Sequence, residues 1–104
     1  IGHSNGGDMT MLFATKYPHL INKAISMDHR RMIMPRTEKP RLYTLRGCDY
    51  DADAGVLPTK QEQEQFHMKV VKLDGITHSN MGENGTEEQH RLINQSIYGF
   101  LTQE

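Results

Sequence analysis

The sequence has 104 residues, of which 36% are hydrophobic and 24% charged, and its formal net charge is -1 at pH 7. This length suits one small domain or a piece of a larger one, and the composition is ordinary for a globular protein. The balanced charge gives no indication of binding to nucleic acid, and no apolar run reaches the length of a membrane span. Cys48 is the only cysteine, which excludes a disulfide within the chain and slightly favours a reducing compartment such as the cytoplasm.

The first eight residues are rich in glycine and small polar side chains, which predicts a tight turn. A helix is expected to follow, because apolar residues recur there at a helical spacing. Pro18 should end this helix, since the residue before a proline disfavours the helical conformation. The side chains expected to share its apolar face are Met9, Leu12, Phe13 and Tyr17.

The rest of the chain alternates between predicted strands and predicted helices. Apolar or alternating runs indicate strands at Ala24–Asp28, Arg41–Arg46 and Met68–Leu73. Two capping boxes predict helices that begin after Thr59 and Thr86. The alternation predicts an α/β fold in which a parallel sheet carries helices on its faces.

The segment of residues 29–40 is interpreted as a connector between two of these strands. Its basic residues are expected to form a solvated loop. With about a dozen residues it is too short for a substantial helical lid, so we expect an open site on this side. The basic residues concerned are His29, Arg30, Arg31 and Arg36.

Gly2-His3-Ser4-Asn5-Gly6 matches the pattern G-x-S-x-G. In this pattern the serine occupies a strained strand-to-helix turn that exposes its hydroxyl, and side chains at the two glycine positions would collide with neighbouring backbone. Gly7 adds further room for the helix to pack closely. We therefore interpret Ser4 as a nucleophile and the backbone N–H of Asn5 as a donor to a developing oxyanion.

This motif and the helix after it resemble the nucleophile elbow of α/β-hydrolases, and the resemblance covers nearly the whole chain. It implies that residues 1–104 are the C-terminal portion of a single α/β-hydrolase domain, with the first strands and a second oxyanion donor supplied by a preceding part. The later matching segments are Ala24–Asp28 for the strand after the elbow helix, Arg41–Asp49 for the strand and turn carrying the acid, and Lys72–Met81 for the histidine loop.

Members of this family carry a triad in the chain order Ser, then Asp or Glu, then His. His78 follows a predicted strand and is interpreted as the general base, because a neutral imidazole can accept the serine proton near pH 7. Asp49 stands where the family places its acid, Asp53 is the alternative, and Asp51 is the weaker candidate. The aspartates without that role would be solvated loop residues.

The expected reaction is hydrolysis of a carboxylic ester, or a related acyl bond, through an acyl-serine intermediate. The alternative is a catalytically inactive binding domain with the same fold. The expected partner is a small-molecule acyl substrate, and no cofactor or metal is expected because no histidines have metal-ligand spacing. The 104-residue piece alone is expected to be inactive, because without the upstream strands one edge of its sheet is open.

Overall fold

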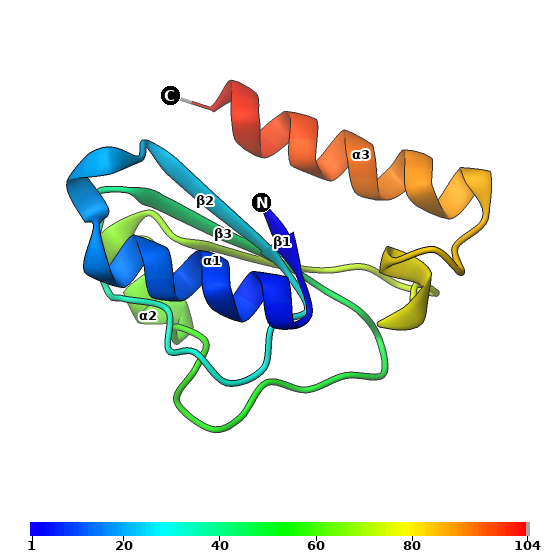
Figure 1. The fold of residues 1–104 in the computed structure, drawn as a ribbon, viewed down its shortest axis with the longest axis horizontal. Helices are drawn as coiled ribbons and strands as arrows, with labels where there is room; N and C mark the ends of the chain where they lie inside the picture. Colours follow the sequence, from blue (N-terminus) through cyan, green and yellow to red (C-terminus); the bar gives the residue numbers. More distant parts are fainter. Residues whose placement is uncertain (104) are drawn as a thin grey trace.

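Four parallel strands form the centre of the structure, a computed structural model that describes residues 1–103 (Figure 1). The strands lie side by side in chain order, and this confirms the predicted α/β class with a parallel sheet. The loops that follow parallel strands meet at one edge of the sheet, which is where sites form in open α/β folds. The strands are β1 (Gly2–His3), β2 (Lys23–Met27), β3 (Arg41–Arg46) and β4 (Lys69–Lys72).

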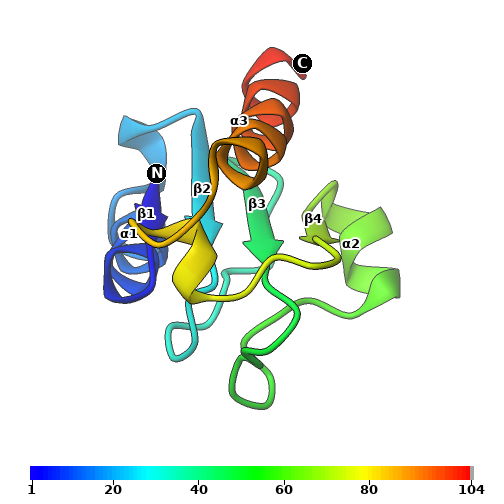
Figure 2. The same ribbon diagram turned by 90° about the vertical axis from the view of Figure 1, so that its right-hand side faces the viewer.

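Helices cover both faces of the sheet. Figures 1 and 2 show α3 over one face, with α1 on the opposite side. None of the helices among residues 1–103 is both long and apolar enough to cross a membrane. The α-helices are α1 (Asn5–Lys16), α2 (Lys60–Phe66) and α3 (Glu87–Thr102), and the short 3-10 helices are η1 (Pro18–Leu20) and η2 (Ser79–Met81).

Both predicted capping boxes are present. The hydroxyl of Thr59 accepts the N–H of Glu62 at 3.1 Å, and the carboxylate of Glu62 accepts the N–H of Thr59 at 2.9 Å. Thr86 and Gln89 make the same pair of contacts at the start of α3. Each pair satisfies backbone donors that the first turn of a helix leaves free.

Two hydrophobic clusters fill the spaces between the sheet and its helices. Because β2 and β3 are central, successive side chains along them enter opposite clusters. The cluster beneath α3 contains Ile25, Tyr43, Leu45, Ile76, Met81, Ile93 and Phe100. The cluster beneath α1 contains Met11, Ala14, Ala24, Met34, Leu42 and Met68, with Phe66 of α2 packed against it.

The predicted apolar face of α1 is wrong. Met9 is 61% exposed, and Phe13 and Tyr17 are also exposed, whereas the buried residues of α1 are Gly7, Met11 and Ala14. Gly7 and Ala14 have little or no side chain, so α1 lies close to the sheet on the side that carries them. The spacing of the large apolar residues predicted a different side of the helix.

The connector of residues 29–40 is only in part the solvated loop that its basic residues predicted. His29 is fully buried, while Arg30 and Arg31 are exposed. The carboxylate of Asp8 in α1 accepts the N–H groups of Arg31 and Met32, each at 2.8 Å. The guanidinium of Arg36 donates to the backbone carbonyls of Met34, Gly55, Val56 and Leu57. The connector is thereby tied to α1 and to the segment that follows β3.

Candidate active site

Ser4 lies on a sharp turn between the end of β1 and the start of α1. Its backbone φ is 57°, in the left-handed region that residues other than glycine rarely adopt. Its N–H donates to the carbonyl oxygen of Met27 at 2.9 Å, which holds the turn against the end of β2. Strain of this kind costs roughly 1–3 kcal/mol and persists where surrounding contacts impose it. The predicted strand-to-helix turn is therefore present at Ser4.

The motif predicts that a side chain at either of its glycines, Gly2 or Gly6, would collide with neighbouring atoms. The structure bears this out at Gly2 only. A Cβ added to Gly2 would lie 2.1 Å from the carbonyl oxygen of Gly6. A Cβ on Gly6 itself would meet no atom within 4 Å, so the expected collision there is wrong. A Cβ on Gly7 would lie 2.9 Å from the Cβ of His29. The close approaches are thus at Gly2 and Gly7, where α1 crosses β1 and the connector.

His78 is brought to Ser4 by the loop after β4. Its backbone immediately precedes η2, and its side chain is 20% exposed. The Nε2 atom of His78 lies 3.2 Å from the Oγ of Ser4. The Ser4 hydroxyl can donate to this nitrogen when the ring proton is on Nδ1. The structure therefore brings together the two residues that the sequence identified as nucleophile and base.

Asp28 completes a chain of hydrogen bonds with these two residues. It follows the last residue of β2, is fully buried, and has a positive φ of 55°. Its Oδ2 lies 3.0 Å from Nδ1 of His78, and its Oδ1 accepts the N–H of Gly47 at 2.7 Å. A buried carboxylate at Nδ1 favours the tautomer in which Nε2 accepts from Ser4.

The structure places Asp28 at the imidazole ring of His78, and none of the aspartates predicted as the acid occupies that position. Asp49 does not meet the ring of His78, because its Oδ1 accepts the backbone N–H of that residue at 2.8 Å. Asp53 pairs instead with Arg30 at 3.1 Å, and Asp51 is exposed. Asp28, just after β2, fills the place at Nδ1, whereas the segment after β3 contacts the backbone and one ring face of His78.

The sequence did contain a signal for Asp28. It is the last residue of the predicted strand Ala24–Asp28, so in a parallel sheet it must lie at the same edge as the serine turn. The resemblance instead favoured the aspartates in the turn after the next strand. The left-handed backbone that turns its carboxylate toward the histidine is a tertiary feature with no marker in the residue pattern.

Arg46 is a buried cation behind the carboxylate. Its Nε lies 3.7 Å from Oδ1 of Asp28, and its Nη2 donates to the carbonyl oxygen of His29 at 2.7 Å. Burial lowers the pKa of Arg46, while the charge of Asp28 acts in the opposite direction. The guanidinium is the positively charged partner of this carboxylate and fixes its orientation.

His29 lies beside this ion pair in a fully buried position. Its Nδ1 is 2.6 Å from the Oγ of Ser26, and its Nε2 has no partner within residues 1–103. Burial first, and then the charge of Arg46, lower its pKa from 6.5 to about 4. The imidazole is therefore neutral in the folded state at neutral pH, because a positive charge there would be buried beside Arg46.

Acid is expected to destabilise the protein through His29. In the unfolded chain this residue takes up a proton near pH 6.5, whereas the folded state resists protonation until about pH 4. The stabilisation is thus complete above pH 6.5 and is lost as the pH falls toward 4, by about 2 to 3 kcal/mol. Urea unfolding of the natural full-length protein across this range checks the slope. His29→Asn should weaken the dependence of the free energy of unfolding on pH, and the exposed His19→Asn should leave it unchanged. Equal pH dependence in both variants would contradict the role of His29.

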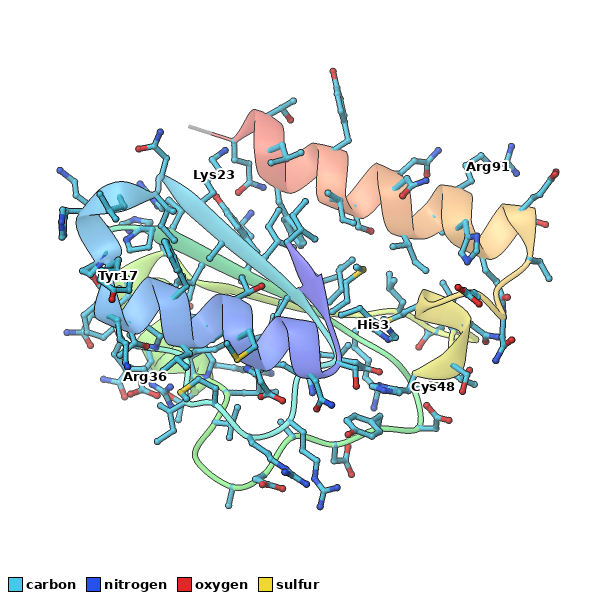
Figure 3. All side chains as sticks on the ribbon, in the orientation of Figure 1. His3, Tyr17, Lys23, Arg36, Cys48 and Arg91 are labelled. Carbon is cyan, nitrogen blue, oxygen red and sulfur yellow. The ribbon has the colours of Figure 1, made fainter. Side chains whose placement is uncertain are left out.

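His3 supports the histidine loop from the opposite side. Its Nε2 donates to the carbonyl oxygen of His78 at 3.1 Å, and the two ring centroids are 4.9 Å apart. The partner of His3 is 75 positions away in the chain, so this contact joins the serine turn to the histidine loop. Figure 3 shows His3 and Cys48 at the end of the molecule opposite Tyr17, which is the end where the loops after the strands meet.

Asn5 is the first residue of α1, so its N–H is one of the amides that a helix leaves without an intrahelical partner. This is the position predicted for the oxyanion donor, and it follows Ser4 directly. Within residues 1–103, no three His, Cys, Asp or Glu side chains are grouped so that they could hold a metal ion. Two shallow hollows of about 710 and 670 Å³ lie along α3 and at the end of the sheet away from the candidate site, and neither is lined by Ser4.

Comparison of the chain with family models, curated proteins and solved structures found no match. The chemistry of the site is therefore inferred from the positions of its own atoms.

Proposed function

We propose that this chain is the C-terminal part of an α/β-hydrolase domain and that the domain is a serine hydrolase of carboxylic esters. The observation that carries the proposal is the hydrogen-bonded series from Ser4 through His78 to Asp28, with contacts of 3.2 and 3.0 Å. It lies beside a strained strand-to-helix turn at one edge of a parallel sheet. The chain order Ser, Asp, His is that of the family, with Asp28 in place of the expected Asp49.

The first half of the reaction follows from this geometry. The Oγ of Ser4 attacks the acyl carbon while its proton passes to Nε2 of His78. The N–H of Asn5 stabilises the negative charge that develops on the carbonyl oxygen. The carboxylate of Asp28 stabilises the imidazolium. Nε2 then returns the proton to the leaving alkoxide, so that an alcohol departs and an acyl-serine remains.

Water completes the cycle. His78 takes a proton from the attacking water and returns it to Oγ of Ser4 when the acyl–oxygen bond breaks. The products are a carboxylic acid and the unmodified enzyme. The residues described here supply the nucleophile, the base, the acid and one oxyanion donor. A second donor and the substrate-binding walls are proposed to come from the preceding part of the domain.

Labelling with a fluorophosphonate probe tests this function directly. The natural full-length protein should react with the probe, because an activated serine attacks its phosphorus atom. Ser4→Ala and His78→Ala should each abolish labelling, and the exposed His19→Ala should retain it. Thermal unfolding shows whether each variant is folded. A folded protein that does not react would contradict the proposal and favour a binding domain with the same fold.

A further inference from the structure

The segment from Gly47 to Tyr50 contacts the candidate site and the loop that carries His78. The N–H of Gly47 donates to Asp28, and the N–H of Cys48 donates to the carbonyl oxygen of Ile76 at 2.8 Å. The carboxylate of Asp49 accepts the N–H of His78. The segment after β3 thus binds both the carboxylate and the histidine loop, although it does not contain the acid.

Tyr50 makes the closest ring contact with His78. The two ring centroids are 3.8 Å apart, and the planes are inclined by 21°, so that the rings stack. The ring of His3, the other neighbour, is more distant: its centroid lies 4.9 Å from that of His78, and the two planes are inclined by 37°. One face of the imidazole is therefore covered by a phenol ring, and the two nitrogens at its edge still contact Ser4 and Asp28.

Contacts outside the site fix the segment that carries Tyr50. The Nε of Arg30 donates to Oδ1 of Asp53 at 3.1 Å, and the side chains of Asp53 and Tyr50 both raise the pKa of this guanidinium. The N–H of Asp53 also donates to the carbonyl oxygen of Arg30 at 2.9 Å. The connector and the segment after β3 are therefore joined where they carry the tyrosine.

We propose that Tyr50 is a positioning residue for His78, whose stacked ring fixes the imidazole plane and stabilises the imidazolium formed during the reaction. This inference rests on the proposed hydrolase function. A cation over the face of an aromatic ring is attracted by the negative face of that ring. The interaction is stronger for the imidazolium than for the neutral ring, so it favours the transition state over the ground state.

Two substitutions separate the ring from the hydroxyl of Tyr50. Tyr50→Phe keeps the aromatic face and loses the hydroxyl, whereas Tyr50→Leu removes the aromatic face. Tyr50→Met is a second non-aromatic variant that retains bulk, in case leucine impairs folding. Tyr98→Leu is a matched control, because Tyr98 is 69% exposed on α3.

The first readout is the proton spectrum of the histidine rings in the natural full-length protein, with His78 assigned from a His78→Gln variant. Stacking on Tyr50 should shift the C–H resonances of His78 upfield. The shift should persist in Tyr50→Phe and disappear in Tyr50→Leu. This measurement does not depend on activity, and its absence in the unsubstituted protein would overturn the proposal.

The second readout is hydrolysis of p-nitrophenyl acetate. Tyr50→Leu and Tyr50→Met should lower kcat by about tenfold with little change in KM, since the stabilised charge exists only after proton transfer. Tyr50→Phe should stay near the unsubstituted rate, as should Tyr98→Leu. Equal losses in the phenylalanine and leucine variants would overturn the stacking role. An upfield shift without any turnover in the unsubstituted protein would instead contradict the hydrolase function, and with it the catalytic part of this inference.

Discussion

Replacement of Asp28 by asparagine is expected to lower kcat for ester hydrolysis by about ten-thousandfold, whereas Asp49→Asn should cost less than tenfold. An asparagine amide at position 28 would present an N–H to Nδ1 of His78 and favour the tautomer whose Nε2 carries the proton. Such a ring cannot accept a proton from Ser4. At position 49 the asparagine side-chain oxygen can still accept the backbone N–H of His78, which is the contact that Asp49 makes.

The prediction must be separated from a loss of folding. Asp28 is the partner of the buried Arg46, and removing one member of a buried ion pair costs several kcal/mol. Thermal unfolding therefore accompanies each kinetic measurement. A double variant supplies a further check: because Asp28 acts through His78, Asp28→Asn should add little to the loss already caused by His78→Ala. A larger loss from Asp49→Asn than from Asp28→Asn would restore Asp49 as the acid.

The elements that were predicted well have local signals. The strand Arg41–Arg46 has the predicted bounds, and both capping boxes form at Thr59 and Thr86. A hydroxyl cap and its partner are separated by three residues, and a strand is marked by its own side chains. These features require no knowledge of distant parts of the chain.

The features that were mispredicted depend on contacts between distant segments. The packed face of α1 follows from the close approach of Gly7 to the connector, and this approach outweighs the periodicity of the large apolar residues. His29 is charged or polar in isolation, yet the fold buries it beside Arg46. Sequence periodicity shows where the apolar residues lie around a helix. Which of them are buried depends on the side of the helix that packs against the sheet.

The candidate site divides in the same way. Ser4 and His78 could be predicted as nucleophile and base because Ser4 lies within the G-x-S-x-G motif and His78 follows a predicted strand. Asp28, the proposed acid, could not be predicted in this way. Three aspartates follow β3 and one follows β2, and all of them lie near one edge of the sheet. The backbone conformation of Asp28, the hydrogen bond from Gly47 and the contact with Arg46 decide which carboxylate faces Nδ1. The expected acids take supporting positions instead, with Asp49 on the histidine backbone and Asp53 on Arg30.

Gly2→Ala is expected to destabilise the protein severely and to lower activity, although the change adds a single methyl group. The new Cβ would lie 2.1 Å from the carbonyl oxygen of Gly6 and 2.3 Å from its carbonyl carbon. Both atoms belong to the backbone of α1, so they cannot move aside as a flexible side chain would. Relief requires the helix to shift from β1, and such overpacking costs roughly 1–3 kcal/mol or more.

A shift of α1 would also move the serine turn, because Ser4 connects β1 to this helix. The loss of activity should therefore exceed the loss of folded protein, with kcat reduced by about a hundredfold for a displacement of the order of 1 Å. Gly6→Ala is the matched control within the same motif, since its Cβ would meet nothing within 4 Å. Alanine is favoured over glycine in a helix by roughly 0.5–1 kcal/mol, so this variant should be as stable as the unsubstituted protein or more stable. Urea unfolding and ester hydrolysis of both variants distinguish the two glycines. If Gly6→Ala were the more damaging change, the neighbour that crowds it would have to lie outside the residues described here, and the steric role assigned to Gly2 would be wrong.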